Sequence, residues 1–133
     1  MNILAFDLGA SGGKLFLATI DDDNISIQEI HRFENVSCSM NGALFWDIIN
    51  IYKEMNTGIK KAIELTGDQI DSFAIDSFSN DFGLIDKNGT LLTPVRCYRD
   101  KRTERHVDHI YSKLSKEQLY NPSGNQNALF NTL

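Results

Sequence analysis

A glycine-rich turn near the N-terminus has the residue types best suited to chemistry. Asp7 precedes Gly9-Ala10-Ser11-Gly12-Gly13, and Lys14 follows this segment. Successive backbone N–H groups in such a turn form a concavity that binds anions. Ser11 adds a hydroxyl donor, Lys14 adds positive charge, and a carboxylate such as Asp7 suits Mg²⁺, directly or through water. One hypothesis for the turn is therefore a phosphate site with a magnesium ion beside it.

Three other interpretations compete for the same turn. The pattern G-x-S-x-G is found at the nucleophile of α/β-hydrolases, but there a helix follows, and here the β-forming run 14–20 follows. A P-loop needs four residues before Gly-Lys and then Ser or Thr; here there are three, and Leu15 follows Lys14. A plain hairpin turn remains open, with glycines that supply positive φ and Asp7 as a turn cap.

A second carboxylate of interest is Asp81, which lies between Phe78 and Phe82 at the end of an apolar run. In a cleft it would accept hydrogen bonds from ligand hydroxyls, and otherwise it is a turn carboxylate. Asp76 lies inside the preceding run, where an unpaired buried carboxylate is costly. Two arrangements would avoid that cost, because Asp76 could pair with Arg99 or could face a cleft.

The run from Arg96 to Arg105 contains five basic residues. It suits a phosphate or acidic ligand, and it equally suits a solvated loop and helix start. Asp100 is placed to cap the helix that follows. His106 and His109 share a helical spacing, but no third ligand follows at a spacing typical of zinc, so we expect no metal site there.

The segments that must position these residues begin with three strands. Residues 2–8, 14–20 and 25–33 are apolar or alternating runs separated by two short polar turns, which predicts an antiparallel meander. We expect residues 34–41 to form a loop.

The strongest helical pattern covers residues 47–66. Asp47 is a suitable N-cap, Gly67 a suitable residue after the C-terminus, and Gly58 lowers helix propensity by about 1 kcal/mol relative to Ala. The predicted apolar face consists of Ile48, Ile51, Tyr52, Met55, Ile59, Ala62 and Ile63.

Further elements follow this helix. Residues 72–78 predict a buried strand, and Asn88-Gly89 between apolar runs 82–86 and 91–95 predicts a hairpin. Residues 103–114 predict a second helix. Ser115 and Gln118 form a capping box for a short third helix that Pro122 is expected to end.

Composition limits the class of protein. The chain has 133 residues, a net charge of −5, 41% hydrophobic residues and 23% charged residues, as in a soluble globular domain and unlike a disordered chain. Its acidity argues against a nucleic-acid partner. It lacks a run of about 20 apolar residues and a basic leader, so we expect no membrane partner and a cytoplasmic location. Two distant cysteines, Cys38 and Cys97, indicate reduced thiols.

Several segments together resemble a known family. The segment 7–14, followed by a β-forming run, resembles the first phosphate motif of the sugar kinase, hexokinase and actin superfamily. Further matches narrow this resemblance to the FGGY carbohydrate kinases, because they occur in family order with similar spacing over nearly the whole chain. They are Glu29–Phe33, Trp46-Asp47, Ile75–Phe78 with Asp81-Phe82, Tyr98–Thr103, Ser123-Gly124 with Gln126, and Phe130–Leu133.

The resemblance implies a fold and an organisation. The fold is α/β and ribonuclease H-like, with a mixed sheet that contains an antiparallel meander and is flanked by helices. Residues 1–133 would form the N-terminal part of the first kinase domain, and the rest of the kinase chain would be a partner. The catalytic aspartate of the family, the general base, lies beyond residue 133, so we expect no catalytic residue here and no activity from this segment alone.

The resemblance also implies an activity and site residues. The γ-phosphoryl group of ATP passes to a sugar hydroxyl with the help of Mg²⁺, and the expected acceptor is the 1-hydroxyl of L-rhamnulose. Asp7 would hold the metal. The nucleotide residues would be Ala10, Ser11, Gly12, Gly13 and Lys14, and the sugar residues Asp81, Phe78, Ser79, Arg99, Asp100 and Gln126.

The sequence departs from the family pattern at two places, of which the first bears on the substrate. Phe78-Ser79 stands where the branch of the family that acts on L-rhamnulose typically has Trp-Gly. Lys14 stands where Arg is usual, which keeps the charge but loses the planar fork. Because of Ser79, kinases of other ketoses, such as L-fuculose or L-xylulose, are one alternative. A noncatalytic nucleotide- or sugar-binding module is a separate alternative.

Overall fold

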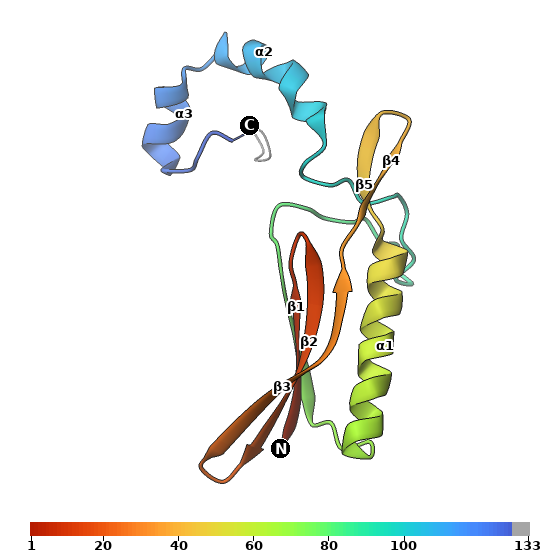
Figure 1. Cartoon of the computed structure of the whole chain (residues 1–133). Helices are drawn as coiled ribbons and strands as arrows, with labels where there is room; N and C mark the ends of the chain where they lie inside the picture. The colour runs from red at the N-terminus through yellow and green to blue at the C-terminus, as the bar shows by residue number, and fades with distance from the viewer. Residues whose placement is uncertain (129–133) are drawn as a thin grey trace. The chain divides into compact units, whose positions relative to one another are not determined.

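The computed structural model describes residues 1–128, which form two compact units (Figure 1). The first unit consists of Met1–Val36 and Asp47–Ser79, and the second of Ser37–Trp46 and the residues from Asn80 onward. The motif Phe130–Leu133 lies outside the described residues. Within residues 1–128, no helix has the length and apolar character needed to cross a membrane.

The first unit is built on a four-stranded mixed sheet. Strands β1 (Asn2–Leu8), β2 (Gly12–Asp21) and β3 (Asn24–Glu34) are antiparallel neighbours, and β6 (Ser72–Ser77) pairs with β1 in parallel. The order across the sheet is β3-β2-β1-β6. The meander and the mixed sheet expected from the sequence are confirmed.

Helix α1 (Ile48–Thr66) covers one face of this sheet (Figure 1). The Asp47 side chain accepts a hydrogen bond from the Asn50 backbone N–H at 2.9 Å, so it caps the N-terminus as predicted. Gly67 adopts φ 62°, and its N–H donates to the Ile63 carbonyl at the C-terminus. Both predicted helix ends are confirmed.

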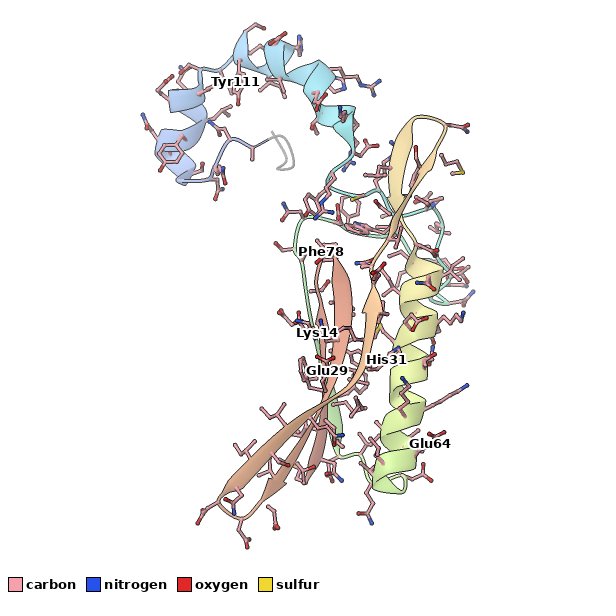
Figure 2. The ribbon with its side chains drawn as sticks, viewed as in Figure 1. Lys14, Glu29, His31, Glu64, Phe78 and Tyr111 are labelled. Atoms are coloured by element: carbon pink, nitrogen blue, oxygen red, sulfur yellow. The ribbon has the colours of Figure 1, made fainter. Side chains whose placement is uncertain are left out.

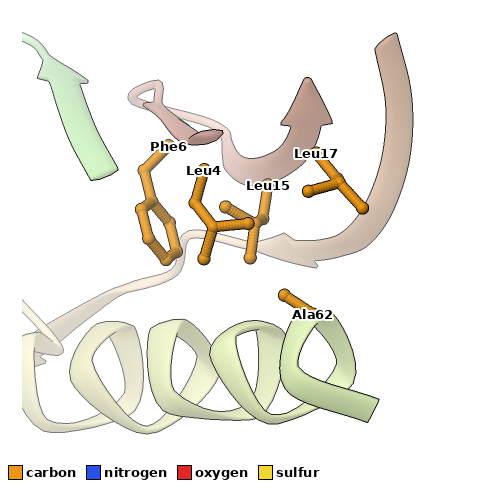
Figure 3. Packing of buried hydrophobic residues seen from close by; sticks show 5 residues of the cluster. All are labelled: Leu4, Phe6, Leu15, Leu17 and Ala62. Atoms are coloured by element: carbon orange, nitrogen blue, oxygen red, sulfur yellow. The ribbon is translucent and has the colours of Figure 1, made fainter. Parts of the chain in front are cut away.

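The core of the first unit lies between α1 and the sheet. It contains Leu4, Phe6, Leu15, Leu17 and Ala62 (Figure 3). Side chains alternate between the two faces of a strand. Asp7 and Lys14 therefore lie on the face opposite α1, next in sequence to the buried Phe6 and Leu15. The same alternation that builds the core presents the polar residues of the turn to solvent.

Two predictions about burial in this unit are wrong. Tyr52 and Ile63, assigned to the apolar face of the helix, are 69% and 36% exposed. The strand 72–78, predicted to be buried, is β6, which is exposed along its length, with Phe73 at 66%. The reason is position, because β6 is the edge strand and pairs only with β1 among the described residues.

The second unit begins with a hairpin that was predicted as a loop. Strands β4 (Ser37–Met40) and β5 (Ala43–Trp46) pair antiparallel. Asn41 and Gly42 join them with φ of 52° and 75°, the left-handed values that a two-residue hairpin turn requires. The Asn-Gly pair was the available signal, and it was missed because only four residues flank it on each side.

The predicted hairpin at residues 82–95 is only partly present. A bridge joins Ile85 and Leu91, and the Leu92 N–H donates to the Leu84 carbonyl. The residues that follow, from Val95 to Cys97, form backbone hydrogen bonds with β5 instead. The Trp46 N–H donates to the Val95 carbonyl at 2.9 Å, and the Cys97 N–H to the Leu44 carbonyl at 3.0 Å. Competition from β5 therefore shortens the local hairpin.

The helical segments after residue 100 are shorter than predicted. A 3₁₀ helix (Lys101–His106) and α2 (Val107–Tyr111) replace the single helix 103–114. The third helix is α3 (Lys116–Ser123), and its capping box between Ser115 and Gln118 is confirmed. Pro122 lies inside α3, and Gly124 with φ 65° ends the helix instead. Cys38 and Cys97 are free thiols, as expected.

Candidate functional site

The turn between β1 and β2 is held by hydrogen bonds from two directions. The Gly9 N–H donates to the Gly12 carbonyl at 2.9 Å. Asn35, just after β3, donates its backbone N–H to the Ser11 carbonyl at 3.2 Å and its side-chain amide to the Gly9 carbonyl at 3.1 Å. Asn35 is a positioning residue that sequence reasoning missed, because only the register of β3 brings it to this turn.

The glycines of the turn serve close packing. A Cβ on Gly12 would lie 2.8 Å from the Phe33 carbonyl oxygen, and one on Gly13 would overlap the Phe33 ring. The plain hairpin hypothesis required positive φ here. The glycines with positive φ among the described residues are instead Gly42, Gly67, Gly89 and Gly124. The turn does join the antiparallel strands β1 and β2, so the hairpin is present, but its glycines are required by close packing and not by positive φ.

Charged side chains form a row across the sheet on the face opposite α1. Asp7 is the register partner of Lys14 on β2 and of Asp76 on β6, and Lys14 is in turn the partner of Arg32 on β3. The Lys14 Nζ lies 3.4 Å from the Asp7 Oδ2. Asp76 is exposed beside Asp7 rather than buried.

Arg32 at the end of this row is bound to Glu29. Its Nε and Nη2 donate to the two Glu29 carboxylate oxygens at 2.9 and 2.6 Å. This bond to Arg32 lowers the pKa of Glu29. Figure 2 labels Lys14 and Glu29 on the sheet. A recess of about 670 Å³ lies here, lined by Asp7, Gly9, Ser11, Gly12, Gly13, Lys14, Arg32, Phe33 and Glu34.

Asp7 fits a magnesium ion that is shared with phosphate groups. Its side chain is 51% exposed at the end of β1. Within residues 1–128, no three side chains of His, Cys, Asp or Glu gather into a metal cluster. Mg²⁺ needs no such cluster, since one or two carboxylates with substrate phosphates and water suffice. The residues present therefore suit a metal that arrives with a nucleotide.

The second unit holds Asp81 in a defined orientation. The Trp46 indole Nε1–H donates to the Asp81 Oδ2 at 2.5 Å. The other oxygen, Oδ1, is buried and has no hydrogen-bond partner in the part of the chain that the structure describes. A recess of about 200 Å³ lies beside it, lined by Asn80, Asp81, Phe82, Leu84, Thr93, Pro94, Arg96 and Arg102.

Asp100 is a buried carboxylate at the centre of this unit. Its two oxygens accept hydrogen bonds from the Leu44 N–H at 2.7 Å and the Arg102 N–H at 3.0 Å. The guanidinium groups of Arg96 and Arg102 lie 3.4 and 3.6 Å from it. The Leu44 N–H is the main cause of the lowered pKa of Asp100. The predicted capping role is confirmed at the 3₁₀ helix.

The remaining sugar-site predictions fall in both units. Phe78 and Ser79 follow β6 at the end of the first unit. Arg99 and Gln126 are exposed in the second unit, where the Arg99 Nε donates to the Tyr98 hydroxyl at 3.1 Å. The structure thus brings the predicted nucleotide residues together with Asp7 in the first unit, and in the second unit it joins Asp81 to Trp46.

The fold defines the class of protein first. A xyloylose kinase from Brucella ovis superposes with a TM-score of 0.72 at 20% identity over 99% of this chain and 27% of that chain. The glycerol kinase of Plasmodium falciparum with ADP superposes with a TM-score of 0.71 at 16% identity, over 98% of this chain and 27% of that chain. The fold is therefore that of the sugar kinases.

Residues 2–133 match the N-terminal domain of the FGGY family of carbohydrate kinases, and the chain belongs to this family. It is 39% identical over 130 residues to the rhamnulokinase of Oceanobacillus iheyensis, which covers 98% of this chain and 27% of that protein. It is 40% identical over 135 residues to the rhamnulokinase of Mannheimia succiniciproducens, a match that covers 100% of this chain and 28% of that protein. The chain thus spans little more than a quarter of these relatives.

Proposed function

We propose that residues 1–133 form the N-terminal part of the first domain of a kinase that phosphorylates L-rhamnulose. The observation that carries this proposal is the 39–40% identity, over essentially the whole chain, to two rhamnulokinases. The oxygen of the sugar 1-hydroxyl forms a bond to the γ-phosphorus of ATP while the bond to the β-phosphate bridging oxygen breaks. ADP leaves, and the hydroxyl proton passes to a base outside these residues.

The first unit would bind the nucleotide. Residues 10–14 would surround the phosphates, and Lys14 would add a positive charge. The Lys14 Nζ lies 3.4 Å from the Asp7 Oδ2, and both side chains are partly exposed to solvent. Such an exposed pair is weak, so phosphate oxygens can compete for the ammonium group. Mg²⁺ beside Asp7 would neutralise charge on the phosphates.

The second unit would bind the sugar through Asp81. Its buried Oδ1 is an acceptor without a donor among the described residues. A sugar hydroxyl can supply that donor. Arg99 and Gln126 of the same unit would add to this sugar site, and Asp100 would orient Arg96 and Arg102 beside Asp81. A role in sugar binding for Phe78 and Ser79, which belong to the first unit, stays a prediction.

The test is ADP release by the longest natural form of this polypeptide, with L-rhamnulose, L-fuculose and L-xylulose as acceptors. We expect a preference for L-rhamnulose and a loss in kcat/KM on the order of 10- to 100-fold in Asp81→Asn, which removes a hydrogen bond to a charged group. Asp108→Asn, at an exposed position of α2 in the same unit, is the matched control. Preference for another ketose would contradict L-rhamnulose as the substrate and leave the kinase activity in place. Absence of turnover with every sugar would contradict the kinase proposal.

The 133-residue segment by itself is expected to release no ADP with any of these sugars. It holds groups that bind and orient, and phosphoryl transfer also needs a base and a closed site that excludes water. Turnover by the purified 133-residue chain would refute this part of the proposal.

A further inference from the structure

We infer that Trp46 is a positioning residue that orients Asp81 toward the sugar. This inference rests on the proposed function, and it concerns a side chain that the proposal leaves unused. The Trp46 indole N–H donates to the Asp81 Oδ2 at 2.5 Å, whereas the buried Oδ1 has no partner among the described residues, and Asp81 is one of the residues that line the recess. Trp46 thereby decides which oxygen of the carboxylate meets the ligand.

The indole is itself held firmly. Trp46 is the last residue of β5 and only 3% exposed. Its backbone N–H donates to the Val95 carbonyl at 2.9 Å, and the Tyr98 ring packs at 6.2 Å from it. Since an indole nitrogen donates and never accepts, this contact commits Oδ2 of Asp81 as an acceptor and restricts the rotation of the carboxylate.

The arginines at the same recess leave Asp81 available. Arg96 and Arg102 both line the recess, and a carboxylate beside two guanidinium groups would ordinarily pair with them. Both of them instead contact Asp100, at 3.4 and 3.6 Å. Among residues 1–128, no ion pair joins Asp81 to either arginine. The Asp81 Oδ1 can therefore accept a hydrogen bond from a hydroxyl group of a ligand that enters the recess.

The pair can be observed without any enzyme assay. Trp46 is the only tryptophan of the chain, so the 133-residue protein gives one indole N–H signal in a proton–nitrogen NMR spectrum. We expect Asp81→Asn, which keeps the shape of the side chain, to move this signal upfield, because a hydrogen bond to a carboxylate is stronger than one to an amide. Asp108→Asn in α2 is the control and should leave it in place. An indole signal unchanged in Asp81→Asn overturns the inference.

Kinetics of the longest natural form test the consequence for the sugar. Trp46→Phe keeps an aromatic ring and removes the donor. We expect the KM for the preferred sugar to rise on the order of tenfold, with the KM for ATP unchanged and kcat within about twofold. Tyr120→Phe is the aromatic control. A sugar KM unchanged in Trp46→Phe, or a loss confined to kcat, overturns the positioning role.

The two proposals fail in different ways. If the wild-type polypeptide phosphorylates no sugar, the kinase proposal fails, and the indole signal still decides whether Trp46 holds Asp81. Titration of the 133-residue chain with L-rhamnulose then gives a second reading of the site. A shift of the indole signal that is lost in Asp81→Asn supports the pair as a sugar contact, and no shift at saturating sugar contradicts that contact.

Discussion

Lys14 and Asp7 lie directly opposite each other on β2 and β1, with the Lys14 Nζ 3.4 Å from the Asp7 Oδ2. This pair stands beside the turn that Asn35 ties to the end of β3. Because both side chains are partly in solvent, the pair contributes about 0–1 kcal/mol to stability. In the proposed function, Lys14 would contact the phosphates and Asp7 would hold the metal.

The first prediction concerns this lysine. Lys14→Gln should weaken ADP binding by the longest natural form on the order of tenfold, because a charge-assisted contact to phosphate is lost. Lys14→Arg keeps the charge and should bind ADP within about threefold of wild type. Isothermal titration calorimetry measures both. Equal affinity in Lys14→Gln and wild type would remove Lys14 from the nucleotide site.

The second prediction concerns Asn35. Asn35→Ala removes the 3.1 Å bond from its side chain to the Gly9 carbonyl and keeps the backbone bond to Ser11. Chemical denaturation should show a loss of about 1 kcal/mol in unfolding free energy. ADP affinity should fall by several-fold because the turn loosens. Asn56→Ala, which removes a side-chain bond to the Tyr52 carbonyl within α1, serves as the control.

The third prediction concerns Asp100 and acid. Its folded pKa is lowered, so its contribution to stability is present above its unfolded pKa of about 4 and is lost as pH falls through the folded value. Asp100→Asn should lower the unfolding free energy by about 2 kcal/mol at pH 7 and flatten this acid dependence. Trp46 fluorescence follows the unfolding, since Trp46 lies in the same unit. An acid dependence as steep in the variant as in wild type would contradict the assignment.

The fourth prediction concerns Gly58 in α1. Alanine has a helix propensity about 1 kcal/mol better than glycine, which alone would make Gly58→Ala stabilising. A Cβ there would lie 2.7 Å from the Leu15 Cδ2 and 3.3 Å from the His31 Cβ. Since Leu15 is fully buried, we expect a net loss of about 1–2 kcal/mol from overpacking. Circular dichroism during urea unfolding measures it, with the exposed Lys60→Ala as the control.

His31 shows why such a helix position tolerates little change. Its Nε2 lies 2.8 Å from the Glu54 Oε2, and its Nδ1 lies 2.9 Å from the Lys61 Nζ. Both partners belong to α1, so this histidine ties β3 to the helix next to Gly58. A side chain at position 58 would push on this network as well as on Leu15.

Features set by neighbours in the chain followed from the sequence. Asp47 and Gly67 end α1, Ser115 and Gln118 begin α3, and Asp100 caps the 3₁₀ helix, each as predicted. Caps and short turns depend on residues two to four positions apart, and their side chains have few alternative partners. The ordered motifs also pointed to the family, because they span nearly the whole chain.

Tertiary structure decided what depends on distant partners. Trp46 meets Asp81 and Leu44 meets Asp100 across 35 and 56 residues, and Val95 leaves its local hairpin for β5. Each of these groups had several chemically acceptable partners, so residue type and spacing could not choose among them. The exposure of Phe73 likewise depends on β6 lying at the sheet edge. The sequence by itself determined most of the elements, several of their ends and the family. Only the packing of the elements decided which oxygen of Asp81 accepts from Trp46 and which has no partner among the described residues.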